Sequence, residues 1–212
     1  MKTYENFTMK ISYAITVWNE RKEIEDLFTF LHASKRDQDE IVILMDEKGP
    51  DEVWEYLQSI SSHATVMQLK FNNDFSDLKN KLTAMCTGDW IFQIDADEMI
   101  TEDTINYLPE ILEQNSFLDM ILVPRVNTVD GLTMGHIQKW KWRVNDAGWV
   151  NWPDYQMRIY RNTDDIQWTG RVHEKLTGYR QYAPLPQDPK YALQHHKKIA
   201  RQEKQNQYYD TL

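Results

Sequence analysis

The chain has little cysteine, no long hydrophobic run and fewer positive than negative side chains. Its single cysteine, Cys86, excludes an intramolecular disulfide framework and suits a reducing compartment. We expect Cys86 to pack in the core rather than to act as a nucleophile. No apolar run approaches the ~20 residues of a membrane span, and the polar start MKTYENFTMK does not resemble a signal peptide. These absences predict a soluble, cytoplasmic protein, with peripheral attachment to a membrane as an open alternative.

The shortage of positive charge also limits the choice of partners. The 212 residues include 24 Lys and Arg against 33 Asp and Glu, a formal net charge of -9. This balance argues against a dedicated nucleic-acid binder, although it is compatible with a local basic groove. A hydrophobic content of 41% is enough for a sizeable core, and the sequence has no repeat, linker or low-complexity segment. We therefore expect one domain over residues 1–212.

Strand-like and helix-like patterns alternate through the first 125 residues. Such alternation predicts an α/β fold with a parallel sheet covered by helices. After residue 124 the alternation stops, and we interpret the second half as an extension of the same domain. The predicted strands lie at 11–17, 41–45, 65–69, 90–94 and 120–123, and the predicted helices at 19–31, 51–59, 75–85 and 102–113.

The most informative segment is Gly88 to Glu98, an apolar run that ends in three acids. In an open α/β sheet, ligands bind outside the carboxyl ends of the strands. Asp95 and Asp97 alternate on an extended backbone, so both can point the same way, and a divalent cation would relieve their repulsion. Carboxylate oxygens suit Mg²⁺ or Mn²⁺. An equally weighted alternative is that these acids merely cap the helix beginning near Thr101, because acids favour helix N-termini.

Motifs along nearly the whole chain resemble family 2 glycosyltransferases, in a branch that includes lipopolysaccharide-core β-glucosyltransferases. The resemblance implies the GT-A fold, a Rossmann-like, mostly parallel sheet flanked by helices with a C-terminal acceptor-side extension. Residues 9–123 would then bind a nucleotide sugar, and residues 124–212 would face the acceptor and end in a helix. The motifs are the segment Ile11 to Glu20, Asp46, the helix with Phe75, Lys79 and Asn80, the D-x-D strand, Pro124-Arg125, Trp152 to Tyr160, and Gly170 to Glu174.

The same resemblance assigns the donor site. A UDP-sugar is the favoured donor, with Mn²⁺ or Mg²⁺ as the metal ion. Asp97 would be the main metal ligand, with Asp95 and one of the adjacent His195 and His196 as further ligands; the sequence does not choose between the two histidines. Donor contacts would come from Thr16, Val17, Trp18, Glu20, Asp46, Lys79, Asp95 and Arg158.

Family 2 membership would also imply transfer with inversion, in which a carboxylate removes the proton of the attacking hydroxyl. Asp154, in the Trp-Pro-Asp-Tyr-Gln context, is the leading candidate for this base. Glu174 is the rival, and an ion pair of Glu174 with Arg171 or Arg158 is an equally weighted alternative to a direct role.

Four tryptophans lie in a polar setting in the second half, at Trp140, Trp142, Trp149 and Trp152. Aromatic faces stack on sugar rings and on nucleobases, so we favour an acceptor platform over a core cluster. The basic strip of Lys197, Lys198, Arg201 and Lys204 would be a solvated face or touch phosphates.

The sequence thus predicts a metal-dependent glycosyltransferase. A nucleotide-sugar-binding protein without turnover is one alternative. A nucleotidyltransferase is another, but it would need a glycine-rich phosphate loop after the first strand, and residues 16–20 contain no glycine. The acceptor is left open between a glycan or lipid-linked saccharide, a protein side chain and a modified DNA base, as are the donor sugar and the oligomeric state.

Overall fold

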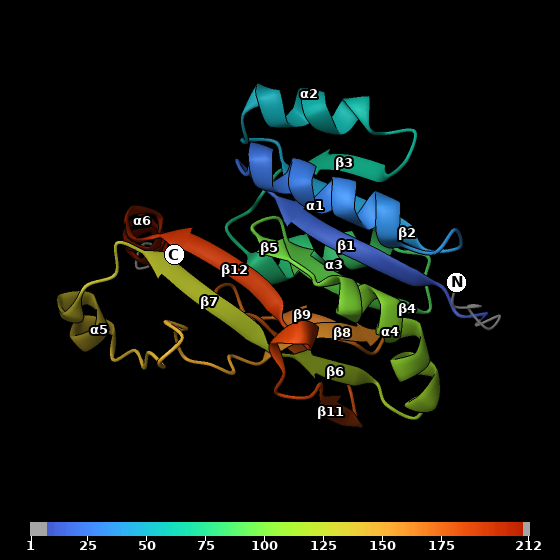
Figure 1. Cartoon of the computed structure of the whole chain (residues 1–212). Helices are drawn as coiled ribbons and strands as arrows, with labels where there is room; N and C mark the ends of the chain where they lie inside the picture. The colour runs from blue at the N-terminus through green and yellow to red at the C-terminus, as the bar shows by residue number, and fades with distance from the viewer. Residues whose placement is uncertain (1–7, 210–212) are drawn as a thin grey trace.

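A seven-stranded sheet forms the centre of the protein (Figure 1). The computed structural model describes residues 8–209, and all structural statements concern this range. The strand order is β11-β6-β8-β4-β1-β2-β3. The strands are β1 (Ile11–Val17), β2 (Glu40–Asp46), β3 (Thr65–Leu69), β4 (Trp90–Asp95), β6 (Met120–Val123), β8 (Gln156–Arg161) and β11 (Tyr182–Pro184).

The sheet is mostly parallel, as predicted. β1 pairs in parallel with β2 and β4, β2 with β3, and β6 with β11. β8 is the exception, because it lies antiparallel between β4 and β6. The sequence pattern did not indicate this insertion. Its consequence is that a strand from the second half of the chain lies directly beside the strand that carries the D-x-D acids.

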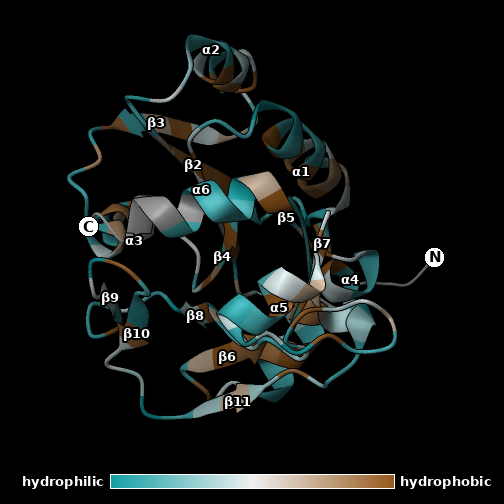
Figure 2. Cartoon of the chain, turned by 90° about the vertical axis from the view of Figure 1, so that its left-hand side faces the viewer, coloured by the Kyte–Doolittle hydropathy of each residue, from teal (hydrophilic) through white to brown (hydrophobic). Residues whose placement is uncertain are grey.

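Helices cover both faces of this sheet. Alternate residues of β1 point to opposite sides, so that Tyr13 and Ile15 join one core cluster and Ala14 joins the other. The first cluster includes apolar residues of α1 (Arg21–Ser34), α2 (Asp51–Ser59) and α4 (Glu102–Gln114), and the second includes those of α3 (Phe75–Met85). Figure 2 shows hydrophobic residues concentrated along β2, β4 and β6 and hydrophilic residues over the middle of α6 (Ile199–Tyr209).

Local side-chain contacts explain where two of these helices begin. Asp74 accepts hydrogen bonds from the backbone N–H groups of Ser76 and Asp77 and so caps α3. Thr101 caps α4, because its Oγ1 accepts the N–H of Thr104 at 3.1 Å. The alternative in which the D-x-D acids cap this helix is therefore wrong.

A smaller sheet brings a C-terminal segment of the chain next to Glu98, which directly follows the D-x-D acids. β12 (Leu193–Lys198) pairs in parallel with β7 (Arg125–Asp130) and antiparallel with the short strand β5 (Glu98–Met99). In this register His195 lies opposite both Asn127 and Glu98. The remaining elements are β9 (Gln167–Thr169), β10 (Lys175–Thr177), the helix α5 (Met134–Trp140) and the 3-10 helix Pro189–Tyr191.

Two further expectations can be compared with the structure. Cys86 is buried, and burial raises the pKa of its thiol to about 12, so it is a poor nucleophile as predicted. Among residues 8–209, no helix combines the length and the apolar character needed to cross a bilayer.

Candidate functional site

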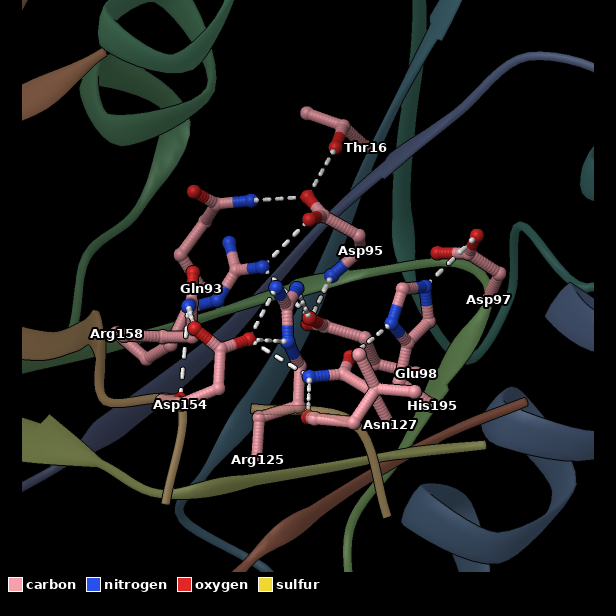
Figure 3. Close-up of polar contacts among 12 residues, drawn as sticks. Thr16, Gln93, Asp95, Asp97, Glu98, Arg125, Asn127, Asp154, Arg158 and His195 are labelled. Carbon is pink, nitrogen blue, oxygen red and sulfur yellow. Dashed lines mark hydrogen bonds and ion pairs between the residues drawn. The ribbon is translucent and has the colours of Figure 1, made fainter. Parts of the chain in front are cut away.

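Asp95 stands at the carboxyl end of β4, beside the end of β1. Thr16 is its partner in the sheet register and donates a hydrogen bond from Oγ1 to Asp95 Oδ1 at 3.3 Å. Arg158, from the adjacent strand β8, donates from Nη2 to Asp95 Oδ2 at 2.5 Å (Figure 3). Burial opposes ionisation of Asp95, but the positive charges of Arg158 and Lys79 outweigh it and hold the carboxyl pKa well below its usual range.

Glu98 is a buried hub that sequence reasoning did not single out. It is 1% exposed and accepts hydrogen bonds from Arg125 Nη1 at 2.8 Å and from Arg158 Nη2 at 2.7 Å. Its other oxygen accepts the backbone N–H of Asp95 at 3.1 Å. Its position directly after Asp97 was the available signal. Glu98 therefore holds two arginines in place and shapes the backbone of the D-x-D segment.

Asp154, the leading candidate for the base, is held by several donors. One oxygen, Oδ2, accepts from Arg125 Nε at 2.9 Å, Arg125 Nη2 at 2.7 Å and Asn127 Nδ2 at 2.8 Å. The other oxygen, Oδ1, accepts from Gln156 Nε2 at 2.9 Å. Burial raises the pKa of Asp154, but the Arg125 charge and these hydrogen bonds outweigh burial, so the net pKa is lowered and the carboxylate is ionised at neutral pH.

Asn127 and His195 connect Asp154 with Asp97 (Figure 3). Asn127 contacts Asp154 and His195, and His195 contacts Asp97. The amide nitrogen of Asn127 donates to Asp154, so its oxygen is the atom that faces His195 Nδ1 at 2.7 Å. An amide oxygen can only accept, and Nδ1 must therefore carry a proton. In the neutral imidazole, Nε2 then presents a lone pair, and this atom lies 3.4 Å from Asp97 Oδ2.

The neighbouring His196 points the other way, because successive residues of a strand alternate between its faces. Its Nδ1 lies 2.8 Å from Thr128 Oγ1, and its Nε2 lies 2.9 Å from Asp130 Oδ2. His196 is exposed, whereas His195 is 7% exposed. Only one histidine of the pair thus faces the D-x-D segment.

Asp97 has longer contacts with its partners than the other three carboxylates of the site have with their arginines. Its partners His195 Nε2 and Arg201 Nη2 both lie at 3.4 Å, whereas the arginine contacts of Asp95, Glu98 and Asp154 lie between 2.5 and 2.9 Å. Burial raises the pKa of Asp97, but when His195 is protonated its hydrogen bond and charge, together with the charge of Lys197, outweigh burial and lower the pKa to about 2. Asp97 is therefore ionised at neutral pH.

The Asp97 and His195 donor atoms fit a divalent metal ion that is completed by a substrate. A carboxylate oxygen and a neutral imidazole nitrogen suit Mn²⁺, and Mg²⁺ is usually held by one or two carboxylates plus substrate phosphates. Within the described part of the chain, no group of three or more His, Cys, Asp or Glu residues is arranged to hold a metal ion. The protein would thus supply two ligands, and bound phosphate and water would supply the rest.

The loop after β1 contains several residues predicted to contact the donor. Val17 is buried, whereas the indole of Trp18 is 53% exposed. Glu20 shapes this loop, because its Oε2 accepts the backbone N–H groups of Trp18 at 2.9 Å and Asn19 at 3.0 Å. Its Oε1 pairs with Arg201 of α6, which therefore joins the loop to Asp97.

Asp46 and Lys79 lie on the same side of the fold but outside the hydrogen-bonded group around Glu98. Asp46 ends β2, and its Oδ1 accepts the backbone N–H groups of Lys48 and Phe71, both at 3.2 Å. Lys79 is buried in α3, forms an ion pair with Glu174 and lies 4.5 Å from the centre of the Trp168 ring. Glu174 does form an ion pair, but the predicted partners Arg171 and Arg158 are wrong, because Glu174 pairs with Lys79.

The four tryptophans between residues 140 and 152 are half-buried, unlike Trp90 and Trp168, which are 1% and 4% exposed. They form two ring pairs, with ring centroids 4.7 Å apart for Trp140 and Trp142 and 5.1 Å apart for Trp149 and Trp152. The partial burial of both ring pairs favours accessible rings over a core cluster. We call these four residues the tryptophan surface.

Comparisons with known proteins agree with this architecture. The sequence model described as Glycosyl transferase family 2 matches residues 12–183. The SPbeta prophage-derived glycosyltransferase SunS of Bacillus subtilis (strain 168) is 25% identical over 180 residues, which are 84% of this chain and 37% of SunS. The dolichol-phosphate mannosyltransferase of Pyrococcus furiosus is 26% identical over 110 residues, 51% of this chain and 31% of that protein.

Solved structures show the same fold. S. aureus TarS 1-349 in complex with UDP superimposes with a TM-score of 0.64 at 15% sequence identity, over 89% of this chain and 60% of that chain. The predicted α/β fold with a mostly parallel sheet is thereby confirmed. The matches cover only about a third of the length of these curated relatives, 37% of SunS and 31% of the mannosyltransferase.

Proposed function

Because the chain belongs to glycosyl transferase family 2, we propose that its site transfers a sugar from a nucleotide-diphosphate donor to an acceptor hydroxyl with the help of a divalent metal ion. The observation that carries this proposal is the pair formed by Asp97 and His195 at the carboxyl end of β4, where a charged oxygen faces an imidazole lone pair at 3.4 Å. Asp97 and His195 would hold the metal ion, and Asp95 would support Asp97 from the same segment.

A divalent cation bound there would stabilise the charge that develops on the leaving diphosphate. The chain itself contributes further positive groups on the same side. Arg201 reaches Asp97 from α6, and the Lys79 charge acts on Asp95. We assign both cations to neutralising the diphosphate, and Arg158, buried between Asp95 and Glu98, to holding Asp95 in position.

The nucleoside would lie at the ends of β1 and β2. The backbone of Thr16 and Val17, the exposed ring of Trp18 and the carboxylate of Asp46 end at that edge of the sheet. A UDP-sugar is the favoured donor, and the TarS structures with UDP and with UDP-GlcNAc support this choice. The order and spacing of the motifs support assignment to the branch that includes lipopolysaccharide-core β-glucosyltransferases.

Asp154 is the base that we favour for inverting transfer. It is ionised, it is held rigidly by Arg125, and its Oδ1 accepts only one of the hydrogen bonds described above. Glu174 is the less favoured base because it forms an ion pair with Lys79. The acceptor would approach over the tryptophan surface, whose loop is tied to β7 by the bridge between Asn127 and Val150.

A donor panel tests this function. UDP-, GDP- and CMP-sugars, each with Mn²⁺, are scored for thermal shift and for slow donor hydrolysis without acceptor. We expect one nucleotide class to raise the melting temperature and to be hydrolysed, and Asp97→Asn to lose hydrolysis while keeping its fold. Thermal shift without hydrolysis in any class would favour a nucleotide-sugar-binding protein without turnover. Release of pyrophosphate from a nucleoside triphosphate would instead favour a nucleotidyltransferase.

A further inference from the structure

We propose that Asn127 is a positioning residue that orients His195 toward the metal ion and Asp154 toward the acceptor through the two ends of one amide group. This inference rests on the proposed function, because the roles of His195 and Asp154 come from it. Asn127 stands near the middle of β7 and matches none of the motifs found in the sequence. Its contacts connect the acceptor half of the chain with the D-x-D segment.

The two ends of the amide have different partners. Nδ2 donates to Asp154 Oδ2 at 2.8 Å, and Oδ1 lies 2.7 Å from His195 Nδ1. The backbone keeps the side chain in place from both sides, since Asn127 is paired with His195 of β12 and bridged to Val150. The orientation of the amide is thus determined by an ionised carboxylate, which can only accept a hydrogen bond.

This orientation decides which imidazole nitrogen is available to a metal ion. With Asn127 Oδ1 accepting from Nδ1, the neutral His195 ring carries its proton on Nδ1 and presents the lone pair of Nε2 to Asp97. Without this acceptor, the proton can move to Nε2, where Asp97 would accept it in a hydrogen bond. The Nε2 lone pair would then be lost as a metal ligand. Partners of this kind around metal-binding histidines affect metal affinity strongly.

An amide is the side chain that satisfies both contacts. An aspartate at position 127 would keep an acceptor for His195 but would lose the donor to Asp154 and add a like charge beside it. An alanine would lose both contacts. The variants Asn127→Asp and Asn127→Ala therefore separate the two roles. Asn162→Ala is the matched control, because Asn162 also uses its amide as a donor, to the carbonyls of Cys86 and Gly88 before β4.

The first measurement is the tautomer of His195, read from ¹⁵N NMR spectra of histidine-labelled protein at a pH where the ring is neutral. It requires neither donor nor metal. We expect the Nδ1–H tautomer in the wild type, in Asn127→Asp and in Asn162→Ala, and a shift toward Nε2–H in Asn127→Ala. An unchanged tautomer in a folded Asn127→Ala variant would overturn the inference and leave the proposed function untouched.

The second measurement is the affinity for Mn²⁺ in the presence of UDP, followed by electron paramagnetic resonance. We expect Asn127→Ala to weaken Mn²⁺ binding ~10–100-fold, and Asn127→Asp to bind Mn²⁺ as the wild type does while losing transfer. Equal Mn²⁺ affinity of Asn127→Ala and wild type would refute the positioning of the metal ligand. If the wild type did not bind Mn²⁺, the metal ion in the proposed function would be wrong. The role of Asn127 toward a metal ion would then be wrong as well.

Discussion

Arg125 donates two hydrogen bonds to one oxygen of Asp154, from Nε at 2.9 Å and from Nη2 at 2.7 Å. Asn127 donates a third to the same oxygen, Oδ2. The opposite oxygen, Oδ1, accepts from Gln156. Because three donors occupy Oδ2, the atom of Asp154 that is suited to take a proton from an acceptor is Oδ1.

With Oδ1 of Asp154 as the proton acceptor, a change at this residue should affect the rate of transfer rather than donor binding. Asp154→Asn removes the proton acceptor and should lower the rate of transfer ~10²–10⁴-fold, while affinity for the nucleotide sugar stays largely unchanged. Glu174→Gln should instead largely keep transfer and strengthen binding of the anionic donor, because Lys79 keeps its charge but loses the carboxylate that neutralises it. Steady-state kinetics and donor titrations of both variants provide the comparison. If Glu174→Gln lost transfer while Asp154→Asn kept it, Glu174 rather than Asp154 would be the base.

Binding of the metal ion should be coupled to binding of the nucleotide. With Asp97 and His195 as the two protein ligands, the affinity for Mn²⁺ should be weak alone and tighter with UDP, since phosphate oxygens complete the site. Calorimetry with and without UDP measures this coupling. Asp97→Asn should abolish it and abolish transfer with little loss of folding, since the variant keeps the side-chain shape. A wild type that stays fully active in excess chelator would show that the metal assignment is wrong.

The tryptophan surface should bind the acceptor. Trp140→Ala, Trp142→Ala and Trp149→Ala should each reduce acceptor affinity by ~1–3 kcal/mol if the ring stacks on the acceptor, and donor hydrolysis without acceptor should barely change. Trp168→Ala is the control for a buried ring and should cost ~3–5 kcal/mol of folding stability. Melting temperatures and both activities are compared. A similar collapse of stability in all four variants would refute the platform.

Glu98 should matter for stability more than for chemistry. Glu98→Gln keeps the side-chain size but leaves the charges of Arg125 and Arg158 without their shared partner. Removal of one member of a buried ion pair typically costs ~3–5 kcal/mol, which urea denaturation can measure. Glu102→Gln, at an exposed position in α4, should change stability by no more than ~0.5 kcal/mol. Equal stability of the two variants would mean that the Glu98 network is energetically neutral.

Acid stability should depend on Glu40, at the opposite end of the sheet from the site. Burial opposes its ionisation, but hydrogen bonds from Lys10, Ser12 and Thr87 outweigh burial and lower the pKa of Glu40 to about 2. A folded pKa below the unfolded value of ~4.3 stabilises the protein fully above that pH, and the stabilisation is lost as the pH falls toward 2.

Glu40→Gln should therefore be less stable than the wild type at pH 7 and should show a smaller loss between pH 4.3 and 2. The urea midpoint as a function of pH gives the measurement. Parallel curves for the two proteins would contradict the assignment of this pKa to Glu40.

Elements with strong local patterns could be predicted almost residue by residue. The strands Thr65–Leu69 and Met120–Val123 and the helix Phe75–Met85 have the predicted bounds. Their apolar spacing and the turn residues beside them are local properties, so neighbouring residues contain the necessary information. The predicted helix at 19–31 is displaced to Arg21–Ser34, because Glu20 bonds backward to the N–H groups of Trp18 and Asn19 and keeps the loop residues out of the helix.

Contacts between distant residues could not be predicted in this way. Asp97 and His195 are 98 positions apart, and Arg158 and Asp95 are 63 apart. The hub at Glu98 and the amide of Asn127 become apparent only when β8, β7 and β12 are placed beside β4. The sequence of β8 does not predict its antiparallel position between β4 and β6, because pairing between distant strands depends on the whole sheet.

The sequence by itself determined the alternation of strands and helices, the placement of the acids after an apolar strand and the candidate residues for donor, metal and base. Each of these follows from local spacing or from a motif that a single segment contains. The tertiary structure alone decided that His195 rather than His196 faces Asp97, because the strand register sets which side of β12 meets the D-x-D segment. It also decided that Arg125 and Asn127 hold Asp154, since side chains that are far apart in the chain form hydrogen bonds only when the fold brings them together.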